Sequence, residues 1–153
     1  SYFIDETINV LKLVGNLDAV IFKGHPAINI SVFRDVMGEN IKVTNENIYD
    51  LFPKTALIIG SATGSLAEAI ACGVSVVVVA QKHELITNPL TDMGKGKMWD
   101  IAFNAIEIEQ KMKKLLKFRT KNMDEIKGIA NWYKDNLFIE PSKENIVKTF
   151  ELK

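Results

Sequence analysis

Residues 56–80, ALIIGSATGSLAEAIACGVSVVVVA, decide the fold that this sequence predicts. Two apolar, β-branched runs, ALIIG and VSVVVVA, flank a turn rich in serine, threonine and glycine and a short helical stretch that ends at Gly73. Unalternating apolar runs of this length are typical of parallel strands buried on both faces. The pattern therefore predicts a right-handed strand–helix–strand unit. Backbone N–H groups at the start of its helix would point out of the carboxyl edge of the sheet, where an anion can bind.

Strands and helices are expected to alternate before this unit. The expected strands are at residues 18–23 and 41–44. The expected helices end near residues 14, 37 and 52. The first helix would be capped by Asp5 or Thr7. The third would be capped within residues 45–47 and ended by Pro53.

The sequence becomes mainly helical after residue 80. Residues 81–97 predict a long polar loop, and residues 101–106 fit either a last short strand or the start of a helix. Further helices are expected over residues 107–118, 124–138 and 142–152. Ser142 would cap the last of them. This order of elements predicts an α/β fold with a doubly wound parallel sheet and carboxy-terminal helices.

The composition is that of one globular domain. The 153 residues are enough for a single core, and 19 basic residues balance 19 acidic ones, so no overall field favours nucleic acid. Cys72, the only cysteine, is expected to fill the core, and no disulfide can form within the chain. No apolar run reaches the length of a membrane span, so we expect a cytoplasmic location. The basic run from Lys111 to Lys121 fits a solvated helix face or, alternatively, weak peripheral contact with the inner face of a membrane.

Three loops that follow predicted strands carry polar groups. They are GHP at residues 24–26, SATGS at residues 61–65 and QKH at residues 81–83. Ligands of open α/β sheets bind outside the carboxyl ends of the strands. Ser61, Thr63 and Ser65 supply hydroxyls that can converge on a phosphate oxygen, and Gly64 lets backbone N–H groups approach it.

A purely structural role is open for the same turn. Ser65 and Glu68 have the spacing of a capping box, in which the Glu68 carboxylate accepts a hydrogen bond from the Ser65 N–H. That role does not need Ser61 or Thr63. The Glu68 carboxylate can instead bind the two hydroxyls of a ribose, and the spacing alone does not decide between the two roles.

His25 is the second candidate for phosphate chemistry. An imidazole with an unperturbed pKa of about 6.5 can donate to a phosphate or act as an acid. A lone histidine in a turn is, however, often an ordinary loop residue. Lys23 is expected to point along the sheet. Lys82, His83, Lys95 and Lys97 can close over an anion, although a solvated loop is the favoured interpretation.

Several common motifs are absent from the sequence. It has no GxGxxG, no GxxxxGK[ST], no HExxH and no cysteine pair. These absences argue against a classical dinucleotide fold, a P-loop and a zinc site, and we expect neither a metal nor a cofactor.

The remaining motifs resemble, in their order and spacing, the carboxy-terminal domain of GT-B glycosyltransferases. They are KGHP at residues 23–26, IIGSATGS at residues 58–65, LAEA at residues 66–69 and CGVSVVV at residues 72–78. The resemblance covers residues 18–80 and is closest to bacterial surface and capsular polysaccharide enzymes, which carry a His-Pro motif and a serine-rich motif.

This resemblance implies a Rossmann-like, donor-binding half of the GT-B fold and a nucleotide-activated sugar as the substrate. It assigns residues as follows: His25 to catalysis and the donor phosphate, Ser61, Thr63, Gly64 and Ser65 to the phosphate, Glu68 to the ribose, and residues 44–47 to the base. Gly60 stands where many retaining enzymes carry a glutamate, which argues against the retaining class.

The chain is interpreted as a single donor-binding domain over residues 1–153. The amino-terminal acceptor domain and the first strand of this domain are missing from the predicted elements, so we expect a fragment that binds a donor and does not transfer it alone. The alternatives are a sugar-nucleotide 2-epimerase of the same fold and a non-catalytic α/β module that binds a phosphorylated ligand or a partner protein.

Overall fold

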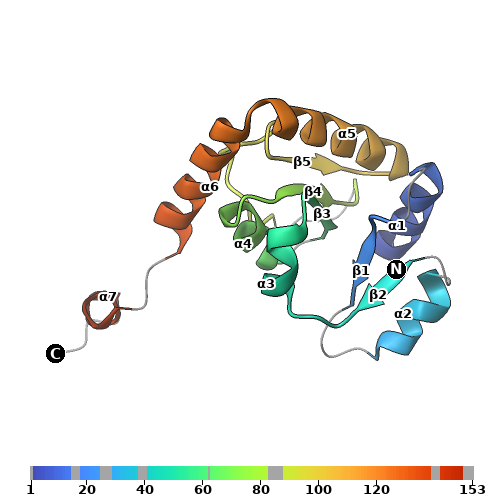
Figure 1. The fold of residues 1–153 in the computed structure, drawn as a ribbon, viewed down its shortest axis with the longest axis horizontal. Coiled ribbons are helices and arrows are strands. Elements are labelled where there is room, and N and C mark those ends of the chain that lie inside the picture. The colour runs from blue at the N-terminus through green and yellow to red at the C-terminus, as the bar shows by residue number, and fades with distance from the viewer. Residues whose placement is uncertain are drawn as a thin grey trace.

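The computed structural model describes residues 2–14, 18–24, 29–37, 41–61, 63–82, 88–138 and 142–149. The strands in these residues are parallel and form two small sheets, which Figure 1 shows next to each other. One sheet pairs β1 (Ile21–Lys23) with β2 (Lys42–Thr44), and the other places β4 (Ser75–Val79) between β3 (Leu57–Gly60) and β5 (Trp99–Ala102). The α/β class with parallel strands is therefore confirmed. The predicted single doubly wound sheet is not seen in the described residues, where the strands stay in two separate ladders.

The predicted central unit is present. β3 leads through α4 (Ser65–Ala71) to β4, and the two strands pair in parallel with Ile58 opposite Val76. All five residues of β4 are buried. The apolar run of this strand therefore has the environment that its sequence predicts, a position between two strands and two layers of helices.

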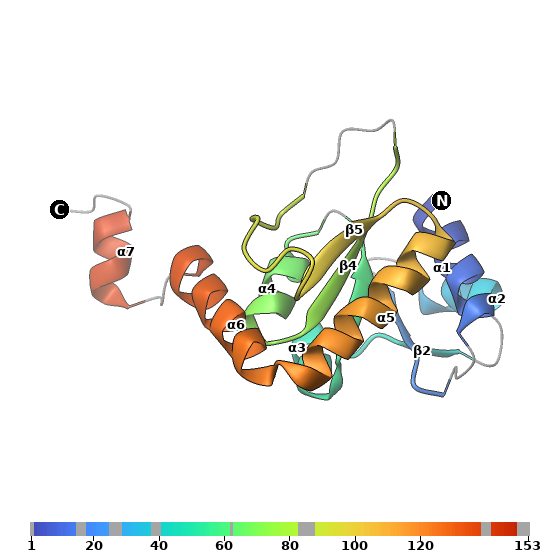
Figure 2. The same cartoon turned by 90° about the horizontal axis from the view of Figure 1, so that it is seen from above.

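Helices cover both faces of the three-stranded sheet. Alternate valines of β4 point to opposite faces, so each set contacts a different pair of helices. On one face they contact α4 and α6 (Met123–Leu137). On the other face they contact α5 (Ala105–Lys121) and α1 (Tyr2–Leu13). Figure 2 shows α5 running along the sheet with α1 beside its amino-terminal end.

The ambiguous segment at residues 101–106 divides between a strand and a helix. β5 ends at Ala102, and Asn104 caps α5. The Asn104 side chain accepts from the Glu107 N–H at 2.9 Å, while the Glu107 carboxylate accepts from the Phe103 N–H at 2.9 Å. This arrangement is a variant of the capping box, with the Phe103 N–H in place of the Asn104 N–H, and it fixes where α5 begins.

The predicted start of the first helix was wrong, whereas the predicted end of the third was correct. The first helix begins at Tyr2, and Thr7 lies inside it, where its hydroxyl donates to the Phe3 carbonyl at 2.7 Å. Asp5 is likewise inside the helix rather than at its cap. The third helix, α3 (Ile48–Leu51), ends before Pro53 with Phe52 as its C-cap, as predicted, and a 3₁₀ turn, η1 (Phe52–Lys54), follows it. Proline is tolerated at the start of a helical turn because the N–H that it lacks would have no partner there.

The other short helices agree with the sequence. α2 (Ile30–Met37) follows β1, and α7 (Lys143–Thr149) begins after Ser142, whose hydroxyl accepts from the Asn145 N–H at 3.2 Å. No helix in the described ranges is both long and apolar enough to cross a membrane.

The described part of the predicted long loop is held firmly against α6. The Tyr133 hydroxyl lies 3.1 Å from the Thr91 carbonyl and 3.2 Å from the Met93 carbonyl, and the Trp99 indole N–H donates to the same Met93 carbonyl at 2.9 Å. Gly94 and Gly96 both have φ of 76°, a left-handed conformation that glycine adopts without a steric penalty. Hydrogen bonds to α6 and two left-handed glycines therefore fix the path of this segment between β4 and β5.

Candidate functional site

A cavity of about 860 Å³ lies where the carboxyl ends of β1, β2 and β3 meet the first turn of α1. Its apolar lining residues are Phe3, Ile4, Phe22, Phe33 and Ile48. Its other lining residues are Lys23, Gly24, Asn45, Glu46, Asn47, Ser61, Thr63 and Ser65. The lining thus combines aromatic and aliphatic side chains with hydroxyls and amides.

The structure brings three of the predicted site residues to this cavity. Ser61 and Thr63 are exposed in the turn after β3, and Ser65 is half-buried at the start of α4. The Thr63 and Ser65 hydroxyl oxygens lie 3.1 Å apart and share a hydrogen bond. All three residues therefore line the same cavity, and the hydroxyls of Thr63 and Ser65 are bonded to each other.

The capping box of Ser65 and Glu68, which the sequence left open as an alternative, is not formed. Gly64 is the N-cap, and no side chain caps this helix start. The first turn is closed by backbone bonds, from the Leu66 N–H to the Thr63 carbonyl at 3.1 Å and from the Ala67 N–H to the Gly64 carbonyl at 3.0 Å. The helix start therefore does not need the serine and threonine hydroxyls, and two of its N–H groups are already used.

Gly64 is not among the lining residues of the cavity. Its φ of −57° is one that any residue adopts, and a Cβ at this position would meet no heavy atom within 4 Å. The sequence suggested that this glycine lets the backbone come close to a ligand. The structure gives no steric reason for a glycine here, because a larger side chain would also fit.

Glu68 is also outside the cavity lining and is directed at α3. A hydrogen bond to the Glu68 carboxylate, and then its charge, raises the pKa of Tyr49. The carboxylate therefore already has a partner within the protein. A role in binding a ribose would require it to turn away from Tyr49.

His25 and His83 lie outside the described residues, but the two residues before His25 line the cavity. Lys23 was expected to point along the sheet. It instead borders the cavity, and its ammonium donates to the Gly24 carbonyl at 2.8 Å. Gly24 is buried, and a Cβ on it would lie 2.9 Å from the Phe33 ring. The glycine of the KGHP motif thus lets an aromatic wall pack closely.

Sequence reasoning missed that aromatic wall. Phe22 of β1 and Phe33 of α2 pack with ring centroids 5.0 Å apart and planes at 43°. Neither residue was given a role in the site from the sequence alone. Their distance in sequence hides the pairing, because it depends on how α2 folds back on β1.

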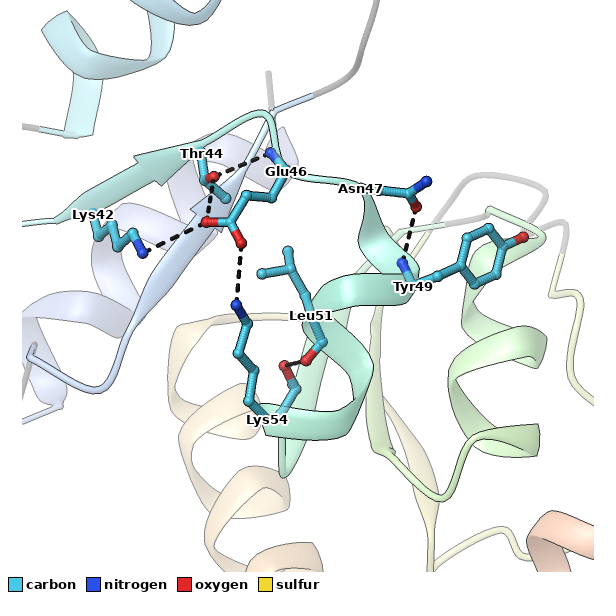
Figure 3. A network of polar contacts seen from close by, with 8 residues as sticks. Lys42, Thr44, Glu46, Asn47, Tyr49, Leu51 and Lys54 are labelled. Carbon is cyan, nitrogen blue, oxygen red and sulfur yellow. Dashed lines mark hydrogen bonds and ion pairs between the residues drawn. The ribbon is translucent and has the colours of Figure 1, made fainter.

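The loop between β2 and α3 is held by a network centred on Glu46, which Figure 3 shows. Its carboxylate accepts from the Lys54 ammonium at 3.1 Å and from the Thr44 hydroxyl at 3.2 Å, and it lies 3.6 Å from Lys42. The hydrogen bond from Lys54 is the main reason that the pKa of Glu46 is lowered. This carboxylate is therefore charged and structural, and it is not poised to act as a base.

Asn47 has a structural task in the same loop. Its side-chain oxygen accepts from the Tyr49 N–H at 3.0 Å and so caps α3. Residues 45–47, which were expected near the base of the nucleotide, do line the cavity. The bonds of Glu46 and Asn47 fix the backbone of this wall.

α1 forms the remaining wall and is fastened to the start of α5. The Tyr2 hydroxyl donates to the Phe103 carbonyl, and the Glu6 carboxylate accepts from the Ala105 N–H. These contacts place the first turn of α1 at the carboxyl edge of the strands. Phe3 and Ile4 border the cavity as a result.

Three other features of the sequence can be placed in the structure: Cys72, the basic run and the possible metal ligands. Cys72 is exposed at the end of α4, so its prediction as core filler was wrong. Much of the basic run is used within the protein: Lys111 donates to Asp100 at 2.8 Å, Lys113 pairs with Glu109, and Arg119 donates to the Gly73 carbonyl. Across the described ranges, no group of three His, Cys, Asp or Glu side chains is placed to hold a metal ion.

Comparisons with known proteins give no family for this chain. A scan against protein-family models, a search of curated proteins and a search of solved structures each found no significant match.

Proposed function

We propose that this chain binds the nucleotide-activated donor of a glycosyltransferase, with the nucleotide in the cavity at the ends of β1, β2 and β3. The observation that carries the proposal is the convergence of the Ser61, Thr63 and Ser65 hydroxyls and Lys23 with an aromatic wall on one cavity. A nucleotide needs this combination, because it joins a planar base to an anionic tail. Five described residues of the KGHP and SATGS motifs, which resemble those of GT-B enzymes, line this cavity; they are Lys23, Gly24, Ser61, Thr63 and Ser65.

The chemistry of the lining fits such a ligand. Hydroxyl O–H groups and an ammonium can donate to phosphate oxygens, and hydrogen bonds to a charged acceptor are stronger than neutral ones. Phe22 and Phe33 offer apolar contact to a base, and the amides of Asn45 and Asn47 offer donors and acceptors at its edge. A volume of about 860 Å³ lies within the range of small-molecule sites.

The position of the cavity agrees with the finer fold that we propose, a doubly wound sheet. In such folds the ligand binds at the carboxyl edge where the strand order reverses. The helix dipole contributes little to this account, since α4 has seven residues and two of its first N–H groups are bonded. The hydroxyls, Lys23 and, by resemblance, His25 supply the positive side of the site.

In group transfer these residues would stabilise the leaving phosphate electrostatically. The cavity lining contains one carboxylate, Glu46, and Lys54 and Thr44 hold it. The described residues thus offer no acid–base pair in the cavity, which favours donor binding over 2-epimerisation. The attacking hydroxyl and its base would come from an acceptor domain.

A thermal-shift panel of CDP, CMP and UDP tests the proposal. At roughly 100 times its Kd, a nucleotide stabilises the folded state by about 2.7 kcal/mol, which is a rise in Tm of roughly 5–10 °C. We expect Ser61→Ala and Ser65→Ala to weaken binding about tenfold and His25→Ala to weaken it as well.

The matched control is Thr120→Ala, which removes an exposed hydroxyl on α5 that donates to the Lys117 carbonyl. This variant should bind as the parent does. Indifference of the parent to all three nucleotides would contradict the proposal. Equal stabilisation by inorganic phosphate alone would favour the non-catalytic phospholigand module.

A further inference from the structure

One polar contact joins the two helices whose first residues line the cavity. Asn47 and Ile48 line it at the start of α3, and Ser65 lines it at the start of α4. Tyr49 follows Ile48, Glu68 lies three residues after Ser65, and the Tyr49 hydroxyl is hydrogen-bonded to the Glu68 carboxylate. Figure 3 shows the Tyr49 ring projecting outward from α3. The contact is therefore made by residues that are direct neighbours of the cavity lining on both helices.

The Tyr49 side chain is held in place for this contact. The Asn47 side chain caps α3 by accepting from the Tyr49 N–H at 3.0 Å. The Tyr49 ring packs edge-on against Phe52, with ring centroids 5.7 Å apart and planes at 86°, and Phe52 is buried in the larger core. Tyr49 is nevertheless 55% exposed. Its hydroxyl is thus fixed in position but accessible, so another donor can replace it without opening the core.

Glu68 is placed to reach a ligand in the cavity. Ser65 and Glu68 are three residues apart in α4, so their side chains lie on the same face of the helix, with Cβ atoms about 5–6 Å apart. Glu68 is half-buried, and a carboxylate that is partly removed from water needs hydrogen-bond donors. One carboxylate can accept from two hydroxyls at once. Glu68 therefore suits a diol that is attached to a phosphate bound at Ser65.

Glu68 must give up its present partner to reach such a ligand. In the conformation bonded to Tyr49, Glu68 is not among the lining residues of the cavity. Contact with a ribose in the cavity would require another rotamer and the loss of this bond. We propose that the Tyr49–Glu68 hydrogen bond is an autoinhibitory contact, which the ribose hydroxyls of a bound nucleotide replace. This inference rests on the proposed donor binding and adds a regulated ribose subsite to it.

The contact lowers the affinity for ribonucleotides in proportion to its population. A ligand that needs Glu68 free binds only those molecules in which the bond is broken, so its apparent Kd rises by the inverse of their fraction. A bond formed in about nine of ten molecules weakens binding about tenfold. The penalty falls only on ligands with ribose hydroxyls, because the hydroxyl of Ser65 meets the phosphate without Glu68. Occupation of the subsite releases the Tyr49 hydroxyl, which couples ligand binding to the surface of α3.

Isothermal titration calorimetry with CDP and with 2′,3′-dideoxy-CDP tests this inference. Tyr49→Phe keeps the ring and removes the hydroxyl. We expect this variant to bind CDP about three- to tenfold more tightly than the parent does, and to bind dideoxy-CDP with unchanged affinity. In a Glu68→Ala background, Tyr49→Phe should have no effect on either ligand. The matched control is Tyr133→Phe, which removes a hydroxyl from α6 and should leave both affinities unchanged.

Two results would overturn the autoinhibitory contact while CDP still binds the parent. Unchanged or weaker CDP binding by Tyr49→Phe would make Tyr49 a support of the site. Equal tightening for CDP and dideoxy-CDP would show that the hydroxyl acts on the cavity as a whole and not on a ribose. Both results leave the donor-binding proposal standing. If neither the parent nor Tyr49→Phe binds CDP, the donor-binding proposal fails, and the autoinhibitory contact fails with it.

Discussion

The two sheets of this molecule differ sharply in how they are supported. The three-stranded sheet lies between two helical layers, and its central strand, β4, is buried along its whole length. The two-stranded sheet has strands of three residues each, and both strands begin at an exposed residue. The two sheets therefore contribute unequally to the stability of the fold and to the candidate site. The first sheet provides the core, whereas the cavity lies at its border with the second.

This difference explains why the candidate site uses loops from both sheets. The SATGS turn is anchored by β3 and α4, whose apolar residues belong to the larger core. The opposite wall, from Phe22 to Gly24 and from Asn45 to Ile48, depends on short elements and on the Glu46 network. Loops carried by a rigid scaffold are where binding residues are commonly found. We expect ligand binding to order the smaller sheet more than the larger one.

The largest expected effect separates the two regions directly. Ile70→Ala in α4 removes a fully buried side chain from the core of the larger sheet and should lower the free energy of unfolding by about 2–5 kcal/mol. Ile21→Ala in β1 removes a side chain that is 40% exposed and should cost below about 1 kcal/mol. Urea unfolding of both variants measures the contrast. Equal losses would show that the smaller sheet is as firmly packed as the larger.

A second comparison concerns two glycines. Gly94 has φ of 76°, and a Cβ there would lie 2.7 Å from the Ile129 Cγ2, so Gly94→Ala should destabilise by about 2–3 kcal/mol. Gly128 lies in α6, and a Cβ there would meet nothing within 4 Å. Gly128→Ala should stabilise by about 0.5–1 kcal/mol through helix propensity. Thermal unfolding should show a lower Tm for Gly94→Ala and a higher Tm for Gly128→Ala. A higher Tm for Gly94→Ala would show that the connection at residues 88–98 does not keep Gly94 in its left-handed conformation.

A smaller effect is expected where α6 holds the connection to β5. Tyr133→Phe leaves the buried ring in place but removes the hydroxyl next to the Thr91 and Met93 carbonyls, which should cost about 1 kcal/mol. Faster hydrogen exchange should be confined to the 88–98 segment. Faster exchange spread evenly over β1 and β2 would mean that the two regions are not independent.

The smallest effect is expected from Glu46, because its side chain and those of its ion-pair partners, Lys42 and Lys54, are exposed. Its folded-state pKa is lowered from 4.5, chiefly by the hydrogen bond from Lys54. The resulting stability is present above the unfolded-state pKa and is lost as the pH falls through the folded-state value. The stability difference between the parent and Glu46→Gln should therefore be largest near neutral pH and vanish in acid.

Urea titrations at a series of pH values follow this difference, and added salt should reduce it. The charge-matched control is Glu144→Gln on α7, which removes an exposed carboxylate from a different element. A difference that grew in acid would contradict the role given to Glu46.

Sequence patterns predicted the larger sheet better than the smaller one. The run VSVVVVA has strong strand propensity and a buried setting, so local pattern and tertiary context agree at β4. Residues 18–23 predicted a buried strand, yet only Ile21–Lys23 forms one, and its first residue is exposed. Pairing partners decide whether an apolar run is buried, and no local pattern encodes which edges meet.

The candidate site shows the same division. The hydroxyls of Ser61, Thr63 and Ser65 were predictable from a turn after a strand, and the structure brings them together at the cavity. Glu68 was not predictable from spacing alone, because its partner Tyr49 lies on another element. The ring pair of Phe22 and Phe33 was missed for the same reason.

An amide NMR titration with CDP and UDP tests the central claim most directly. If the cavity binds a nucleotide tail, saturable shifts should be largest at Gly60, Ser61, Thr63, Lys23 and Gly24, with the amides of α6 unchanged. Ser61→Ala should weaken the response about tenfold, and Thr120→Ala should leave it intact. Saturable shifts centred on α6, or no saturable shift at any amide, would contradict the account.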